Sequence, residues 1–378
     1  MDGVKQANTL SLSEAQRLAW LRLIRSENIG PATFRSLLNH CGSAEAALQA
    51  LPSLSSRGGK KNLRVAPQSD AEAELEAHES LGARLVALGE PDYPPHLRHI
   101  DSPPPLLSVR GGIAVRSPKT IAIAGARNSS LSGQKITQNI ASELGLNGFV
   151  ISSGLARGID AAAHTASLQT GTVAVFAGGI DVIYPSENTQ LLERILDNDG
   201  NAICEMPFGW KARGRDFPRR NRLISGMALG LVIIEAAQKS GSLHTARFAL
   251  EQNREIFAVP GSPMDPRSTG ANRLIQQGAM LTTCAADILS VLEGRLEPEF
   301  PFNAEIGEPS ANDNLEVEEP SETARSKLLS ALGPSPVMVD ELIRFTGESP
   351  RTIQILLLEL ELAGRIERHH SQKVSLLY

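Results

Sequence analysis

Apolar residues in the first zone of the chain, residues 1–80, recur at the spacing of a helix. Leu12, Ala15, Ala19 and Leu23 follow a three- or four-residue period, which places them on one helical face. Gly30-Pro31 then breaks the pattern before a second apolar series begins. This zone predicts an N-terminal helical domain.

The second zone, residues 81–292, alternates short apolar runs with helical stretches. It opens with proline-rich connecting sequence and a short strand at 84–88. Later runs show little polar alternation, as expected of strands that are buried on both faces of a parallel sheet. They occupy residues 120–124, 149–152, 172–177, 202–205, 231–236 and 255–259. The pattern predicts an α/β domain with an extended Rossmann-like, doubly wound, mainly parallel sheet.

Two further zones complete the chain. Residues 293–322 hold ten acidic residues and one base without apolar periodicity, which predicts a disordered acidic linker. Residues 323–378 regain a pattern of three helices followed by two short strands, the arrangement of a winged helix-turn-helix.

Composition excludes several classes of protein. Three cysteines among 378 residues form no C-x-x-C pair, so neither a disulfide framework nor a zinc site is indicated. The apolar runs are shorter than the roughly 18–20 residues that span a bilayer, and the N-terminus lacks a signal-peptide pattern. We therefore expect a soluble cytoplasmic protein without metal or cofactor. Because the net charge is −5, nucleic-acid binding requires a local basic patch.

The first strand-to-helix turn carries Gly125 and Arg127, followed by hydroxyl residues. It lacks the G-x-G-x-x-G pattern of dinucleotide sites, and no P-loop motif occurs in the chain. A glycine, an arginine and hydroxyls at a helix start predict a phosphate site without a cofactor signature.

Two later turns repeat this composition. Ser153, Gly154 and Ala156 lie before an alanine-rich helix, where we expect Asp160 to cap the helix and His164 to pack in the core. Ser240 and Gly241 form another cradle before a helix. Because glycine lacks a Cβ, such turns let backbone N–H groups approach a phosphate closely.

The segment 211–222 contains six bases and one acid. Its phenylalanine offers a face on which a nucleobase can stack, and guanidinium groups bind phosphates. The alternative interpretation is a solvated basic loop whose phenylalanine lies in the core. The candidate nucleic-acid-binding residues of this segment are Lys211, Arg213, Arg215, Phe217, Arg219, Asn221 and Arg222.

These motifs together make the chain resemble the DNA-processing protein A family (DprA/Smf). The matching stretches include G-A-R at 125–127, the turn 152–160 with His164, and F-P-R-R-N-R at 217–222. The resemblance implies a homodimeric, non-enzymatic protein that binds single-stranded DNA and takes part in natural transformation. It implies that the protein protects incoming strands, displaces single-strand-binding protein and loads RecA recombinase.

The resemblance also implies roles for particular residues and for the end domains. DNA would bind to Gly125 and Arg127, to the turn 153–156, and to Phe217, Arg219, Asn221 and Arg222. The N-terminal helices resemble a SAM or helix-hairpin-helix module, and the C-terminal winged helix resembles the family's accessory domain. We expect the dimer interface at the last edge of the sheet, although its residues could instead belong to the core. They are Leu274, Ile275, Met280 and Leu281.

Two other functions remain as alternatives. Glu205, Glu235, Asp160 and Asp181 lie near strand ends and could serve as acids or bases, but they show no motif spacing. A related phosphoribohydrolase acting on nucleoside monophosphates would need P-G-G-x-G-T, whereas residues 260–263 read P-G-S-P. A transcription factor would explain only the winged helix.

Overall fold

A computed structural model describes residues 11–293, 320–369 and 372–377. Its chain forms two compact units. One holds the described residues of 74–293, and the other joins residues 12–73 to the described part of 320–377. The segment predicted as an acidic linker lies, except for its ends, outside the described residues. Within the described ranges, no helix is both long and apolar enough to cross a bilayer.

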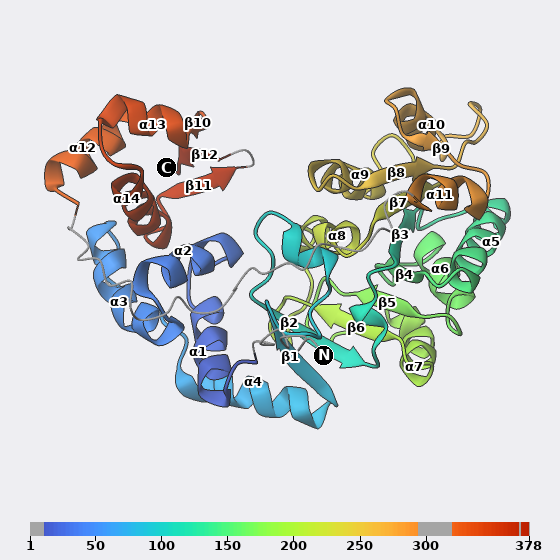
Figure 1. The fold of residues 1–378 in the computed structure, drawn as a ribbon, viewed down its shortest axis with the longest axis horizontal. Coiled ribbons are helices and arrows are strands. Elements are labelled where there is room, and N and C mark those ends of the chain that lie inside the picture. The colour runs from blue at the N-terminus through green and yellow to red at the C-terminus, as the bar shows by residue number, and fades with distance from the viewer. Residues whose placement is uncertain (1–10, 294–319, 370–371, 378) are drawn as a thin grey trace, which may run out of the picture. The chain divides into compact units, whose positions relative to one another are not determined.

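A nine-stranded sheet forms the centre of the first unit, in the order β1-β2-β6-β5-β4-β3-β7-β8-β9 (Figure 1). All neighbours from β6 to β9 in this order pair in parallel, and only β1 and β2 are antiparallel to their neighbours. The mainly parallel sheet is therefore confirmed. The strands are β1 (Ala83–Ala87), β2 (Leu106–Gly111), β3 (Thr120–Gly125), β4 (Val150–Ser153), β5 (Thr172–Val175), β6 (Asn201–Cys204), β7 (Gly230–Ile234), β8 (Glu255–Ala258) and β9 (Met280–Leu281).

Helices cover both faces of the sheet, as expected of a doubly wound fold (Figure 1). Successive side chains of β3 enter different cores: Ile121 and Ile123 pack beneath α5 and α11, while Ala122 and Ala124 pack beneath α8 and α9. The helices are α4 (Gln68–Ser80), α5 (Leu131–Leu146), α6 (Ile159–Ala166), α7 (Thr189–Asp197), α8 (Asp216–Gly226), α9 (Ser242–Glu251), α10 (Thr269–Gln276) and α11 (Ala285–Leu292), with short 3₁₀ turns η1 (His96–His99), η2 (Ala114–Arg116) and η3 (Ser186–Asn188).

Strand order reverses around β3. The chain runs from β3 outward to β4, β5 and β6 on one side, and then returns to β7 on the other side. Ligands of open α/β sheets bind outside the carboxyl ends of the strands at such a switch point. The turns that follow β3, β4 and β7 therefore enclose the expected site.

The second unit contains three N-terminal helices and a winged helix, which confirms both predicted modules. The wing is part of a three-stranded sheet in the order β10-β12-β11. The elements are α1 (Glu14–Arg25), α2 (Pro31–Cys41), α3 (Ala44–Arg57), α12 (Glu322–Ala331), β10 (Val337–Met338), α13 (Val339–Thr346), α14 (Pro350–Leu362), β11 (Ile366–His369) and β12 (Lys373–Leu376).

Helix α14 joins the two parts of this unit, because its consecutive residues 355–360 are all buried. One face packs in the winged-helix core, while other residues contact α2 and α3. The carboxylate of Glu359 is fully buried and forms ion pairs with Arg57 at 3.1 Å and Arg325 at 2.7 Å. Asn28 Nδ2 also donates to the carbonyl of Leu362 at 2.9 Å. The third helix of the winged helix, the element that reads duplex DNA in helix-turn-helix proteins, thus forms an intramolecular interface here.

Candidate nucleic-acid interface

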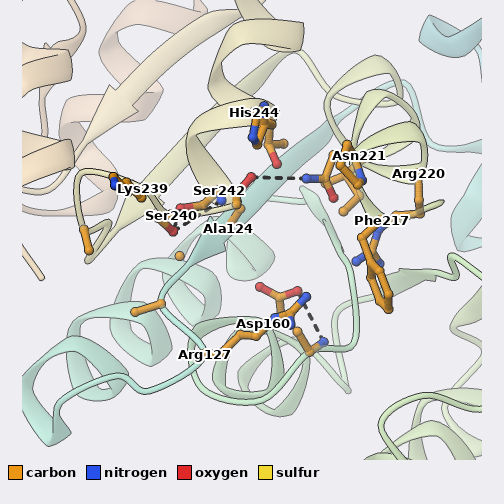
Figure 2. Close-up of a pocket in the computed structure, with 18 of the residues that line it drawn as sticks. Ala124, Arg127, Asp160, Phe217, Arg220, Asn221, Lys239, Ser240, Ser242 and His244 are labelled. Carbon is orange, nitrogen blue, oxygen red and sulfur yellow. Dashed lines mark hydrogen bonds between the residues drawn. The ribbon is translucent and has the colours of Figure 1, made fainter. Parts of the chain in front are cut away.

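A cavity of about 540 Å³ lies at the switch point of the sheet. Figure 2 shows its labelled side chains, with Arg127 and Asp160 opposite Ser242 and His244. Seven of the predicted site residues line it: Gly125, Arg127, Ala156, Phe217, Asn221, Ser240 and Gly241. The sequence analysis missed several other residues of its wall, among them Arg220, Lys239, Ser242, His244 and Arg267.

The first turn links β3 to α5. Gly125 has no room for a side chain, because a Cβ would overlap the carbonyl oxygen of Ile234. Arg127 is exposed, and its guanidinium carbon lies 5.3 Å from the ring centroid of Phe217. This distance is typical of a cation–π contact. The turn therefore places one exposed cation against an aromatic wall of the cavity.

A carboxylate of the protein already occupies the N-terminus of α5. Ser130 N donates to Glu235 Oε2 at 2.8 Å, and the Ser130 hydroxyl contacts Glu235 Oε1. A Cβ on Gly133 would lie 2.6 Å from this carboxyl group, so glycine makes room for it. The sequence predicted a phosphate at this helix end, and the structure places Glu235 there instead.

The second turn links β4 to α6, and its backbone N–H groups also have acceptors within the protein. Asp160 Oδ2 accepts from Gly154 N at 3.1 Å and from Ala156 N at 3.3 Å. The hydroxyl of Ser153 is buried and donates to the Ile123 carbonyl at 2.7 Å. The amides expected to hold a phosphate thus bind Asp160 in the first turn of α6. The expectation that Asp160 caps this helix was wrong, because the N-cap is Gly158 and the Asp160 carboxylate binds the preceding loop instead.

His164 packs in the core behind this turn, as predicted. It is fully buried, and its Nδ1 lies 2.7 Å from Thr172 Oγ1. Burial and, to a smaller extent, the charge of Arg220 lower the pKa of His164 to about 3. The imidazole is therefore neutral at physiological pH and supplies no charge to the cavity.

Arg220 connects the second turn to α8. Its guanidinium is buried and donates to the carbonyls of Gly154, at 2.7 Å, and Val175. Burial lowers the pKa of Arg220 to about 10, although nearby Asp160 opposes the shift, so the side chain stays protonated at neutral pH. Burial raises the pKa of Asp160, and Arg220 offsets part of that effect. Each of these two buried groups therefore favours the charged form of the other.

Some bases of the segment 211–222 form ion pairs with a carboxylate of the protein, and others are exposed without lining the cavity. Arg219 pairs with the buried carboxylate of Glu205 at 2.9 Å, and Arg222 contacts the other oxygen of the same carboxylate. The remaining predicted bases, Lys211, Arg213 and Arg215, are exposed but do not line the cavity. Only part of the predicted positive charge therefore faces the cavity.

Phe217 and Asn221 of α8 both line the cavity. The ring of Phe217 is half-buried, and it contacts Tyr184 edge to face at 5.4 Å. Asn221 Nδ2 donates to the Gly241 carbonyl at 3.3 Å, a contact drawn in Figure 2. Phe217 is therefore a wall residue with a reachable ring, and Asn221 joins α8 to the third turn.

The third turn links β7 to α9 and differs from the first two. The hydroxyls of Ser240 and Ser242 lie 2.7 Å apart, and the amides of Leu243 and His244 donate to carbonyls of the same turn. In the described part of the chain, no carboxylate accepts a hydrogen bond from residues 240–242. Lys239 is exposed beside them. The positive end of α9 thus faces the cavity together with an ammonium group.

The described residues contain no group of three or more His, Cys, Asp or Glu side chains placed to hold a metal. The third turn, Arg127 and Phe217 supply the cavity with groups that can bind an anion and stack on a ring. The DNA-binding role of these residues stays a prediction.

Three family models match the chain in order. They are the DprA-like N-terminal HHH domain at residues 14–77, DNA recombination-mediator protein A at 84–293, and the DprA winged helix domain at 314–372. The Smf protein of Synechocystis sp. is 30% identical over 390 residues, which cover 94% of this chain and 98% of the relative.

Solved structures agree with these matches. DNA processing protein A of Streptococcus pneumoniae superimposes with a TM-score of 0.60 at 33% identity, over 74% of this chain and 98% of that one. The Helicobacter pylori protein, described for its single-stranded DNA binding mode, gives a TM-score of 0.52 at 26% identity, over 56% and 96% of the two chains. The chain therefore belongs to the DNA recombination-mediator protein A (DprA/Smf) family.

Proposed function

We propose that this protein binds single-stranded DNA in the cavity and acts in the cytoplasm as a recombination mediator without enzymatic activity. In this role it protects incoming strands, displaces single-strand-binding protein and loads RecA during natural transformation. The observation that carries the proposal is the third turn, whose cationic helix end faces the Arg127–Phe217 wall across one cavity. Family membership and the single-stranded DNA binding described for the H. pylori protein support it.

The two walls of the cavity take different parts of a nucleotide. A phosphate fits the third turn, where hydroxyls and Lys239 can donate to it. A base fits against Phe217, since stacking on an aromatic ring tolerates any base. Because Arg127 covers part of that ring, it moves aside to admit the base and is then free to bind a phosphate.

The salt dependence of binding reports how many phosphates are neutralised. Each phosphate on a single strand contributes about −0.7 to the slope of log K against log salt. Arg127 and Lys239 alone give a slope of about −1.4 on that basis. Each exposed base of the loop at 211–215 that joins the contact makes the slope steeper by about 0.7.

Fluorescence anisotropy with matched single- and double-stranded oligonucleotides tests the proposal. We expect tighter binding of the single strand, a marked loss of affinity in Lys239→Ala, and no loss in Lys119→Ala. Lys119 is an exposed lysine just before β3, at the opposite end of the strand from the cavity. Equal losses in both variants, or no single-strand binding, would contradict the site.

Two functional assays complete the test. RecA filament formation on strands covered with single-strand-binding protein should accelerate when this protein is added. Base release from a nucleoside monophosphate should not occur, and if it does, the phosphoribohydrolase alternative holds instead.

We further propose a homodimer formed through β9. Among the described residues this strand pairs only with β8, which leaves its outer edge open there, and open edges favour strand addition. Met280 and Leu281 are 43% and 47% exposed, whereas Leu274 and Ile275 on α10 are half-buried. Leu281→Glu should give a folded monomer in light scattering, with Leu146→Glu, an exposed leucine on α5, as the matched control. A dimer in both variants would contradict this interface.

A further inference from the structure

Phe217 lies between the cavity and a second, much smaller hollow. The two share Arg127, Ala156, Phe217 and Arg220 in their walls. The hollow holds only about 20 Å³, and Tyr184 and Arg157 also line it. A space of this size admits a water molecule but no nucleobase. Any base on this side must therefore lie on the outside of the Tyr184 ring.

Tyr184 is an exposed aromatic residue in a firmly held position. Its side chain is 56% exposed, and its ring is inclined at 60° to that of Phe217. The turn that leads to it is anchored by Gly179 N, which donates to the Trp210 carbonyl at 2.9 Å, and by Asp181 Oδ1, which accepts from Gly209 N at 2.7 Å. An edge-to-face pair leaves a ring face open, so Tyr184 presents a fixed surface for stacking.

Positively charged side chains lie on segments near the Tyr184 ring. Arg157 is 65% exposed, and its partner Glu187 lies 3.7 Å away and is 61% exposed. Exposed pairs of this kind contribute little stability, so Arg157 can exchange Glu187 for a phosphate. The loop that carries Lys211, Arg213 and Arg215 packs against the same anchored turn. Lys211, Arg213 and Arg215, which do not line the cavity, therefore lie on a loop that packs against the turn leading to Tyr184.

We propose that Tyr184 and Arg157 form a second binding position for the same DNA strand. This proposal rests on single-stranded DNA binding in the cavity. The strand leaves the cavity past Phe217, its next base stacks on Tyr184, and Arg157 binds the phosphate between the two bases. Because the rings are inclined at 60°, the two bases are splayed and do not stack on each other. Neither position reads base identity.

The length of the DNA ligand separates the two positions. A thymidine dinucleotide is short enough to occupy the cavity alone, whereas a 20-nucleotide oligothymidine reaches both positions. Tyr184→Ala should lose about ten-fold more affinity for the 20-mer than for the dinucleotide, in line with the loss of one stacked base. Tyr184→Trp should restore binding. Arg157→Ala should in addition reduce the salt slope for the 20-mer by about 0.7.

Two controls distinguish stacking from other effects. Leu146→Ala removes a side chain that is 78% exposed on α5 and should change neither affinity. A 20-mer carrying 5-iodouracil should crosslink to Tyr184 under ultraviolet light, as located by mass spectrometry. If Tyr184 only supported Phe217, Tyr184→Ala would weaken both ligands equally and no adduct would form at Tyr184.

The outcomes separate this proposal from the one on which it rests. If the wild-type protein binds no single-stranded DNA, the proposed function fails. If it binds and Tyr184→Ala binds the 20-mer as the wild type does, only the second position is overturned.

Discussion

Two kinds of strand-to-helix turn meet at the carboxyl edge of the sheet. The turns before α5 and α6 each receive a carboxylate of the protein, Glu235 in the first and Asp160 in the second. The turn before α9 has the same mixture of glycine and serine but receives none within the described chain. Similar sequences thus produce two occupied anion sites and one open site, side by side.

This difference shows what a Gly/Ser turn at a helix start does and does not predict. The exposed N–H groups and the helix dipole require an anion or another acceptor, but they do not determine which one. Glu235 reaches the α5 turn from β7, 105 positions away in the sequence. Of the three turns, only the third receives no carboxylate within the described residues, and for this reason we propose it as the phosphate site.

Replacing Arg220 should have the largest effect on this arrangement, because it holds the second turn in place. Arg220→Met leaves the Asp160 carboxylate buried without its cation and removes the donors to two carbonyls. We expect a loss of about 3–5 kcal/mol in the free energy of unfolding, measured in urea.

Two variants control this experiment. Arg194→Met changes an exposed arginine on α7 and should stay within about 0.5 kcal/mol of the wild type. The double variant Arg220→Met with Asp160→Asn should recover part of the loss, because no charge is then left unpaired. Wild-type stability of Arg220→Met alone would show that the pair does not hold the turn.

The sequence predicted the architecture and part of the cavity wall, but not the charge balance. Apolar runs and turn composition locate the strands and the turns around them, and seven predicted residues line the cavity. The neutralisation of Arg219 and Arg222 depends on Glu205, which follows a strand 14 and 17 positions earlier. Such a pairing depends on tertiary packing and leaves no local pattern. The burial of Arg220, in contrast, does have a local sequence pattern. Its position falls on the buried face of α8, together with Asp216, Leu223 and Ile224.

The same limit applies to the end domains. Each was predicted correctly from its own pattern, whereas their association in one unit was not predicted. Residues 353–362 are apolar around most of the helix circumference, and a helix of this kind is buried on all sides. That pattern indicated a second packing surface on α14, but its partner helices are more than 290 residues away in the chain.

Acid should weaken the second turn through His164. Its pKa in the folded protein, about 3, lies below the 6.5 of an unperturbed histidine, so the unfolded chain binds the extra proton first. The stability is complete above pH 6.5 and falls as the pH decreases from 6.5 toward 3. Between pH 6.5 and 5 we expect the free energy of unfolding to fall by about 1 kcal/mol per pH unit. Thermal melts over this pH range measure the loss.

His164→Asn isolates this effect, because it keeps a donor for Thr172 and does not titrate. Its stability should depend less on pH over that window than the stability of the wild type. His244→Asn, which removes an exposed histidine, should retain the wild-type dependence. If the free energy of unfolding depended on pH in the same way in all three proteins, groups other than His164 would cause the acid sensitivity.

A carboxylate placed at the third turn should make it resemble the other two. Gly241 is the N-cap of α9, with φ −60°, and a Cβ there would meet nothing within 4 Å. Gly241→Asp should therefore fold normally, since aspartate is a favoured N-cap. It should lower single-strand affinity about ten-fold through repulsion of the phosphate. Gly241→Asn has the same size as Gly241→Asp without the charge, and its affinity should stay within about three-fold of the wild type. Equal affinities of the two variants would contradict phosphate binding at this turn.

The smallest expected effect concerns the first turn, where Glu235→Gln keeps the shape and removes the charge. An amide oxygen can still accept from Ser130 N, but the favourable interaction with the α5 dipole is lost, at about 1 kcal/mol of stability. The affinity for single-stranded DNA should change by less than about two-fold if the phosphate binds at α9 as we propose, because salt screens the remaining repulsion. A DNA phosphate at the α5 end predicts the opposite result, since removal of an adjacent negative charge would raise the affinity several-fold and steepen the salt dependence. Anisotropy titrations of the wild type and Glu235→Gln at two salt concentrations, with a urea melt of each preparation, therefore determine which turn binds the ligand.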